Sequence, residues 1–288
     1  MRVFFFILFY TGVKIVICTG GRLSTVASRL PSLPAADAII CENGGRIFYP
    51  SEGLYAHLMA AGWMEDTDWR NRLAEYSAPF IEEQVPAVDR QGHVWDAYRE
   101  LLTASDSTGE FSIDPEYTTG FRVKAAVESG SKNMERRMGS HEVVCGSAAL
   151  GSLERWKDVL LNDTSKSYHG KIQVFFNLGM MDVLPVISGK HNAAVYVVER
   201  LGGSWERSAF LCDDDNDLPL AKLVKKAFLP GITHPSVAKA IAENPTHYVV
   251  ASDIVGRPVH GTMAADVVVD AAARFFAQLP RASLQIER

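Results

Sequence analysis

The feature that most constrains this fold is the alternation of short apolar runs with helical stretches at both ends of the chain. Near the N-terminus, apolar runs at 13–18 and 38–41 flank a helical stretch from about Leu23 to Leu30. Buried parallel strands are short, continuous apolar runs, and joining two of them requires a crossover connection. This order therefore predicts a strand–helix–strand unit of a parallel sheet.

The same alternation returns after residue 190. Strands that alternate with helices are typical of a doubly wound α/β sheet, so the sequence predicts an α/β core split into two blocks. Helices are expected at 191–200, 218–226, 236–243 and 261–279, and strands at 208–212, 227–230 and 247–252.

The middle of the chain has a different pattern, in which helical and strand-like stretches are separated by long polar connections. Helices are expected around 54–62, 94–103 and 153–161, and strands at 121–128 and 171–177. We interpret this region as an inserted α+β domain. The predicted organisation is a core made of residues 1–50 and 181–288 with an insert of residues 51–180.

Composition excludes several classes of function. The 288 residues include 29 Lys plus Arg and 34 Asp plus Glu, a formal net charge of −5. This balance provides no basic surface for a phosphate backbone, so no nucleic-acid partner is expected. The four cysteines lack the close spacing of a zinc site and the density of a disulfide scaffold, and they suit a reducing, cytoplasmic location. They are Cys18, Cys41, Cys145 and Cys212.

The apolar run at residues 3–10 resembles the start of a signal peptide because it follows Arg2. Lys14 interrupts the apolar stretch, no small-residue cleavage site follows, and the run is shorter than the roughly 18 residues of a membrane span. We therefore expect no membrane partner. Organelle targeting and a membrane-anchored or secreted binding protein remain as alternatives.

An acidic segment lies directly after the expected strand 208–212 and directly before a helix. It runs from Asp213 to Asp217 and contains Asn216 among four carboxylates. Carboxylates at the end of a parallel strand lie where α/β proteins bind ligands, and an oxygen-only set suits Mg²⁺. One alternative is a solvated acidic turn. A calcium loop is a second alternative, but Leu218 and Val224 occupy the positions that need Gly and Glu.

Two further segments are candidate anion sites. Thr19 and Gly20 follow the first expected strand and precede a helix, which offers a hydroxyl and flexible backbone amides. Lys190 lies at the start of another helix, where its charge opposes the helix dipole unless an anion lies nearby, and His191 follows it. A plain turn and a surface lysine are the respective alternatives.

Taken in order, these segments resemble three motifs of the haloacid dehalogenase (HAD) superfamily. Thr19-Gly20 resembles the second motif, Lys190 the third, and Asp213 with Asn216-Asp217 the fourth. The resemblance extends from Val13 to about Phe276, and the large insertion is similar to that of Cof-type sugar phosphatases and sucrose-phosphate phosphatase. The matching phrases are ENGGRIFY at 42–49, DVLPVISGKHNAA at 182–194 and FLCDDDNDLPL at 210–220.

The resemblance implies a role for each matching residue. Thr19 would hold the transferring phosphoryl group with its hydroxyl and the adjacent amide of Gly20, and Lys190 would neutralise the phosphate and the nucleophile. These roles are reasonable because phosphoryl transfer is catalysed mainly by positioning and charge neutralisation. Asn43 and Arg122 would contact the sugar.

For the fourth motif, the resemblance implies that Asp213 and Asp217 position Mg²⁺ and that Asn216 orients its neighbours. The chain departs from this motif because Cys212, Asp214 and Asp215 replace the usual Gly, Ser and Gly. These changes add negative charge beside the expected metal and remove backbone freedom there.

A larger departure concerns the first motif, Asp-x-Asp, which supplies the nucleophile and the general acid and base in this superfamily. The first acidic residue here is Asp37, and only 18 residues precede Thr19. A strand–helix–strand unit takes roughly 30 residues or more, so the nucleophile strand is missing as a unit.

The sequence thus predicts a HAD-like α/β fold with an inserted α+β cap. The expected function is that of a Mg²⁺-dependent phosphatase acting on a small phosphorylated sugar through an aspartyl-phosphate, in a chain that lacks the nucleophile segment. The chain is either an incomplete version of an active enzyme or a non-catalytic descendant that binds a phosphosugar or a protein. We favour the first, because the matching residues of the second to fourth motifs are retained: Thr19, Lys190, Asp213 and Asp217.

Overall fold

The computed structural model describes residues 12–51, 62–78, 85–126, 147–177 and 179–279. The chain forms two compact units and passes between them several times, the last time within α6 (Lys190–Arg200). The expected helix at 54–62, the apolar run at 3–10 and Cys145 lie almost entirely outside the described residues. Unit 1 comprises Met1–Val16, Ser32–Asp37 and Ala194–Arg288, and unit 2 comprises Ile17–Pro31 and Ala38–Ala193.

The strand–helix–strand pattern at the start of the chain is confirmed. It consists of β1 (Val16–Cys18), α2 (Leu23–Arg29) and β2 (Ala38–Cys41), and all four residues of β2 are buried. Thr19 N donates to Ile40 O over 2.9 Å, which aligns the end of β1 with β2. Because β1 and β2 end side by side, the residues that follow both strands lie close together.

A hairpin extends this sheet. β2 pairs antiparallel with β3 (Arg46–Pro50), which pairs antiparallel with β4 (Trp63–Glu65), giving the order β1-β2-β3-β4. A short helix, α3 (Thr67–Leu73), follows, and its first turn is capped by Asp66, which accepts a hydrogen bond from Trp69 N. Such a cap satisfies an amide that the helix leaves without a partner.

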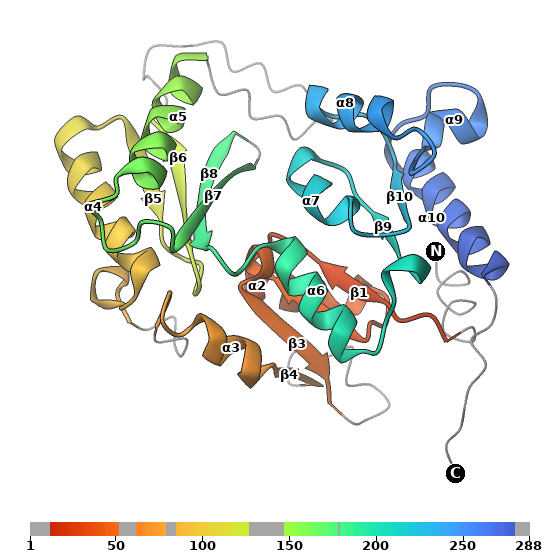
Figure 1. The fold of residues 1–288 in the computed structure, drawn as a ribbon, viewed down its shortest axis with the longest axis horizontal. Coiled ribbons are helices and arrows are strands. Elements are labelled where there is room, and N and C mark those ends of the chain that lie inside the picture. The colour runs from red at the N-terminus through yellow and green to blue at the C-terminus, as the bar shows by residue number, and fades with distance from the viewer. Residues whose placement is uncertain (1–11, 52–61, 79–84, 127–146, 178, 280–288) are drawn as a thin grey trace. The chain divides into compact units, whose positions relative to one another are not determined.

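The second sheet of unit 2 is antiparallel throughout and has the order β5-β6-β8-β7 (Figure 1). Two long helices, α4 (His93–Thr108) and α5 (Ser147–Asn162), bury one of its faces. The alternation of side chains along strands places Phe121 and Val123 in this core and Arg122 on the opposite face. The strands are β5 (Phe111–Asp114), β6 (Phe121–Ala125), β7 (Ile172–Asn177) and β8 (Met180–Pro185).

Two of these strands were not expected. β5 lies within a segment that the sequence predicted to be a polar connection, and β8 crosses the expected domain boundary after residue 180. Both contain an acidic residue, Asp114 in β5 and Asp182 in β8, which breaks the apolar pattern of a strand. Pairing with β6 stabilises both strands, and local propensity does not reveal such pairing.

The sheet of unit 1 is parallel, with the order β11-β10-β9. Ala227 and Leu229 join the hydrophobic cluster covered by α7 and α8, whereas Phe228 between them joins the cluster covered by α9 and α10. The middle strand is therefore buried on both faces, as its apolar sequence predicts. The elements are β9 (Ala209–Leu211), α7 (Leu218–Ala221), β10 (Lys226–Leu229), α8 (Pro235–Glu243), β11 (Tyr248–Val250), α9 (Ala251–Val255) and α10 (Gly261–Gln278).

Most elements expected after residue 190 are confirmed, but the helix expected at 218–226 ends at Ala221. Lys225 N donates to Ser208 O over 3.1 Å, so the backbone has already turned to enter the sheet beside β9. In the described part of the chain, no helix has both the length and the apolar character that crossing a membrane requires.

Candidate functional site

The turn that follows β1 carries the first predicted site residues, Thr19 and Gly20. Gly21 N donates to Thr19 Oγ1 over 3.1 Å, and Thr19 N donates to Ile40 O. The threonine hydroxyl thus accepts a hydrogen bond from the turn and keeps its own proton for another acceptor. This arrangement is suited to an oxyanion.

The loop after β2, Glu42–Gly45, packs directly on this turn. Glu42 N donates to Gly21 O over 2.9 Å, and Asn43 N donates to Thr19 O over 3.3 Å. A Cβ atom on Gly20 would lie 2.5 Å from Asn43 Oδ1, so only glycine allows the Asn43 side chain to lie there. The turn and the loop therefore form one structure, in which Asn43 lies beside Thr19 and Gly20.

A buried carboxylate connects Asn43 with Arg122. Asp182 is 2% exposed and accepts a hydrogen bond from Asn43 Nδ2 over 3.0 Å. The guanidinium of Arg122 binds the same carboxylate through two hydrogen bonds, Nε to Oδ1 at 2.5 Å and Nη2 to Oδ2 at 2.7 Å. Burial opposes the charge of Arg122, but the hydrogen bonds that Arg122 donates to Asp182 and the negative charge of Asp182 outweigh it and raise the Arg122 pKa.

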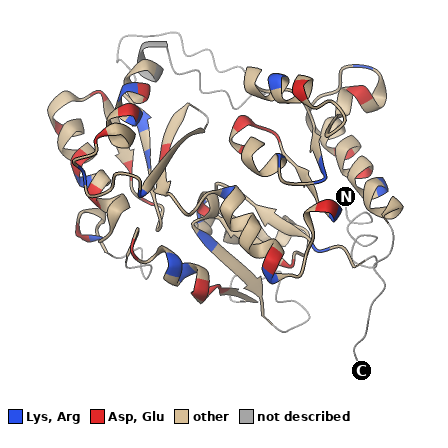
Figure 2. Cartoon of the chain, viewed as in Figure 1, with Lys and Arg blue, Asp and Glu red and all other residues tan. Residues whose placement is uncertain are grey.

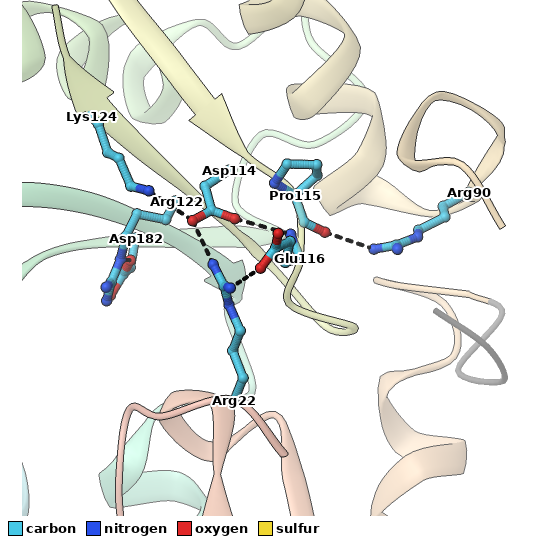
Figure 3. A network of polar contacts seen from close by, with 8 residues as sticks. All are labelled: Arg22, Arg90, Asp114, Pro115, Glu116, Arg122, Lys124 and Asp182. Carbon is cyan, nitrogen blue, oxygen red and sulfur yellow. Dashed lines mark hydrogen bonds and ion pairs between the residues drawn. The ribbon is translucent and has the colours of Figure 1, made fainter. Parts of the chain in front are cut away.

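These charges belong to a row that crosses three strands. Asp114 in β5 pairs in register with Arg122 in β6, which pairs with Asp182 in β8. Residues directly opposite each other on neighbouring strands interact, and opposite charges there are stabilising. Lys124 also binds Asp114, at 2.8 Å, and Figure 3 shows the side chains of this row.

Arg22 links the Thr19–Gly21 turn to the same sheet. Its guanidinium forms ion pairs with Asp114 and with Glu116, which follows β5 (Figure 3). The guanidinium carbon also lies 5.0 Å from the centre of the Tyr117 ring, and that of Arg122 lies 5.4 Å from it. The turn is thus fixed to the antiparallel sheet by charge and by cation–π contacts.

Lys190, the third candidate, begins α6 directly after a close backbone approach. A Cβ atom on Gly44 would lie 2.3 Å from Gly189 O, so the Glu42–Gly45 loop abuts the turn before Lys190. Burial lowers the pKa of the neighbouring His191. The structure therefore brings the start of α6 against the same loop that carries Asn43.

The acidic segment belongs to unit 1. Asp217 is 4% exposed, and its Oδ2 accepts a hydrogen bond from Asp213 N over 3.4 Å, while Asp214 Oδ1 accepts one from Asp215 N over 2.9 Å. Within the described ranges, no three His, Cys, Asp or Glu side chains gather to hold a metal. The carboxylate and amide oxygens of Asp213, Asn216 and Asp217 still match the ligand chemistry of Mg²⁺, which usually keeps several waters.

Unit 2 thus brings together Thr19, Gly20 and Asn43, connects Arg122 to Asn43, and places Lys190 next to the same loop, whereas the acidic segment lies in unit 1. Three charged residues of this region were not recognised as part of it. The sequence contains a signal for each of them. An arginine follows the Thr-Gly-Gly turn, a glutamate precedes Asn-Gly, and an aspartate interrupts an apolar run. They are Arg22, Glu42 and Asp182.

Comparisons with known proteins address the fold. No protein-family model matches the sequence, and no curated protein matches it significantly. A solved structure of sucrose-phosphatase from Synechocystis, in complex with sucrose and phosphate, is 16% identical and has a TM-score of 0.57 over 95% of this chain and 91% of that one. A haloacid dehalogenase-like hydrolase from Bacteroides thetaiotaomicron is 15% identical, with a TM-score of 0.52 over 96% and 91% of the two chains.

A protein from Streptococcus mutans gives a TM-score of 0.58 at 9% identity, covering 96% of this chain and 90% of that one. The chain has the fold of haloacid dehalogenase-like hydrolases. The prediction of a HAD-like α/β fold is therefore confirmed. Likeness at this level of identity establishes the fold, and a shared fold does not define a substrate.

Proposed function

We propose that this protein binds a small phosphorylated sugar and has the phosphate- and metal-binding residues of a Mg²⁺-dependent phosphatase. The observation that carries the proposal is the packing of the Thr19–Gly21 turn on the Glu42–Gly45 loop. This packing gathers a hydroxyl, flexible amides and the Asn43 side chain beside the start of α6. Hydrogen-bond donors held in place before a ligand arrives are what phosphoryl recognition needs.

The residues of unit 2 would bind and orient the phosphoryl group. The hydroxyl of Thr19 donates to a phosphoryl oxygen, and the ammonium of Lys190 neutralises its charge. Asn43, held by Asp182 and packed beside Gly20, would contact the sugar. Arg122 would act on the sugar indirectly, because its guanidinium binds Asp182, which in turn holds Asn43.

Asp213 and Asp217 would hold Mg²⁺, and Asn216 would orient them. Mg²⁺, when bound, neutralises negative charge on a transferring phosphoryl group. The chemistry of these oxygen donors fits the ion. The extra carboxylates of Asp214 and Asp215 strengthen the need for a cation in this segment, because neighbouring carboxylates repel each other.

The 288 residues contain no Asp-x-Asp before Thr19, so the hydrolysis assay compares this chain with a longer form. The test is hydrolysis of p-nitrophenyl phosphate and of a phosphosugar panel with Mg²⁺. We expect no turnover from this chain, and turnover from a form extended by residues encoded upstream of Met1 that include Asp-x-Asp. Substantial turnover by this chain itself would contradict the claim that these 288 residues contain no catalytic nucleophile. An inactive extended form would contradict the proposal that the protein is a phosphatase.

A non-catalytic protein that binds a phosphosugar is the second candidate function, and the packed Thr19–Gly21 turn supports it equally. It predicts saturable binding of a phosphosugar without hydrolysis by either form. Binding measured alongside the hydrolysis assay separates the two candidates, since an enzyme binds and hydrolyses whereas a non-catalytic protein only binds.

A further inference from the structure

Glu42 is a buried carboxylate to which the predicted mechanism assigns no role. It is 1% exposed, and its Oε2 accepts hydrogen bonds from the amide and the hydroxyl of both Thr118 and Thr119 at 2.8 to 3.2 Å. A buried charge is tolerated only when hydrogen bonds replace its hydration. These contacts therefore hold the loop before β6 firmly against Glu42.

The backbone of Glu42 is also unusual. Glu42 and Asn43 both have a φ of 52°, in the left-handed region that residues other than glycine rarely adopt. Such conformations persist where the surroundings over-determine them, and they cluster at ligand sites. Here the surroundings are the Glu42 N to Gly21 O hydrogen bond on one side and the two threonines on the other.

A second buried charge fixes the same loop from its other end. Arg90 Nη1 donates to Pro115 O at 3.1 Å (Figure 3). The same atom donates to Tyr117 O at 2.9 Å, and the guanidinium carbon lies 4.5 Å from the centre of the Trp95 ring. A cation thus binds the carbonyls of the loop, and an anion, Glu42, binds its amides. Opposite charges at the two ends leave residues 115–119 in one position.

The same loop carries Tyr117, whose ring contacts the guanidinium groups of Arg22 and Arg122. Arg22 directly follows the phosphate turn, and Arg122 holds Asp182, which holds Asn43. A continuous series of contacts therefore runs from the turn through Glu42 and the loop to Asn43, and Asn43 contacts the turn again. Glu42 joins the turn to the loop through its own backbone amide and carboxylate, and Arg22 adds a second connection through Glu116 and Tyr117.

We propose that Glu42 is a positioning residue that couples the Thr19–Gly21 turn to residues 115–119. An anion bound at the turn then restricts the loop, and the loop in turn holds the turn in its anion-binding shape. The identity of the ligand, a phosphate ester with a hydroxyl-rich body, rests on the proposed function, whereas the coupling rests on the contacts alone.

The test combines amide hydrogen exchange with titration of inorganic phosphate and glucose 6-phosphate. In Glu42→Gln, we expect exchange at residues 19–21 to rise about tenfold and phosphate affinity to fall about tenfold, because hydrogen bonds to a charged group are lost. Glu65→Gln is the matched control. Its carboxylate pairs with Arg46 on the same sheet, and its loss should leave residues 19–21 unchanged.

Thr118→Val keeps the fold testable should Glu42→Gln not fold, since it removes a single hydroxyl donor at 2.8 Å and keeps the amide. We expect exchange at residues 19–21 to rise roughly threefold. Increased exchange at residues 118–119 with unchanged exchange at 19–21 would overturn the coupling. A chain that binds neither phosphate compound would overturn the proposed function, while the exchange measurement would still decide the coupling.

Discussion

The Thr19–Gly21 turn of unit 2 and the acidic segment of unit 1 are stabilised by different kinds of contact. The turn is held by residues distant in the sequence, such as Asp182, which binds Asn43 and Arg122. The acidic segment is held partly by hydrogen bonds within it, in which Asp217 accepts from Asp213 N and Asp214 from Asp215 N, and partly by Thr233, whose hydroxyl donates to Asp213 O over 2.7 Å. The charge distribution in Figure 2 shows acidic residues at both places, but in unit 2 basic residues accompany them.

This difference teaches what each region needs from a ligand. The charges around the turn neutralise each other within the fold, so the turn is shaped before an anion arrives. The acidic segment has four carboxylates within five residues, and because neighbouring carboxylates repel each other, a bound cation would stabilise it. Four experiments test this difference between the two regions.

The largest effect is expected from Asp182→Ala. It leaves the guanidinium of Arg122 without its buried carboxylate and Asn43 without its acceptor. Breaking a buried ion pair by removing one partner costs about 3–5 kcal/mol, which urea unfolding would measure. Glu206→Ala is the control, because its ion pair with Lys225 is exposed and contributes about 0–1 kcal/mol. Equal losses in both variants would remove the distinction between the regions.

The second effect concerns the close approach of the loop to α6. Gly44→Ala introduces a Cβ atom 2.3 Å from Gly189 O at a φ of +91°, so we expect a loss of about 2–3 kcal/mol in unfolding free energy. Gly109→Ala is the matched control, with a φ of +66° and no atom within 4 Å, and it should lose about 1 kcal/mol. Similar losses would show that backbone strain alone, and not contact with Gly189, keeps glycine at position 44.

A smaller effect is expected from Mg²⁺ on the acidic segment. At a concentration ten times its Kd, the ion should raise the unfolding free energy by about 1.4 kcal/mol by binding the folded state. Asp213→Asn and Asp217→Asn should abolish this increase, whereas Asp114→Asn, in unit 2, should preserve it. Stabilisation that survives both substitutions would place the metal elsewhere.

The smallest effect is a pH dependence from His191. Its folded pKa is lowered by burial, so below the ordinary value of about 6.5 the unfolded state binds a proton that the folded state does not. Stability from this residue is therefore complete above that pH and is lost as the pH falls below it. Thermal midpoints from pH 8 to pH 5 should decline less in His191→Gln than in the parent chain. If the thermal midpoints of both proteins depended on pH in the same way, His191 would not contribute to the pH dependence of stability.

The order of elements was predictable because it depends on local patterns. The strand at 38–41 and the helix at 261–279 follow from continuous apolar character and helical periodicity, and both were found. β5 and β8 were missed because Asp114 and Asp182 belong to a charged row that only pairing with β6 brings together. Local patterns do not encode partners that lie 60 or more residues away, as Asp182 does from Arg122.

The same limit explains the site. Thr19, Gly20 and Asn43 were predicted because each follows a recognisable strand or matches a short motif. Glu42 was not predicted to be a site residue, because its contacts are with two threonines 76 and 77 residues further along the chain. Short sequence segments thus indicated candidate site residues, whereas the contacts that hold those segments in place were found only in the structure.

The most direct test of the central claim, that unit 2 carries a preformed phosphate site, is calorimetric titration of inorganic phosphate onto the 288-residue chain without Mg²⁺. We predict saturable binding that Thr19→Ala and Lys190→Ala each weaken about tenfold, because each removes a charged or charge-assisted contact. Lys171→Ala, which removes an exposed lysine of the same unit, should bind as the parent does. Absence of saturable binding, or equal affinities in all four proteins, would contradict the account.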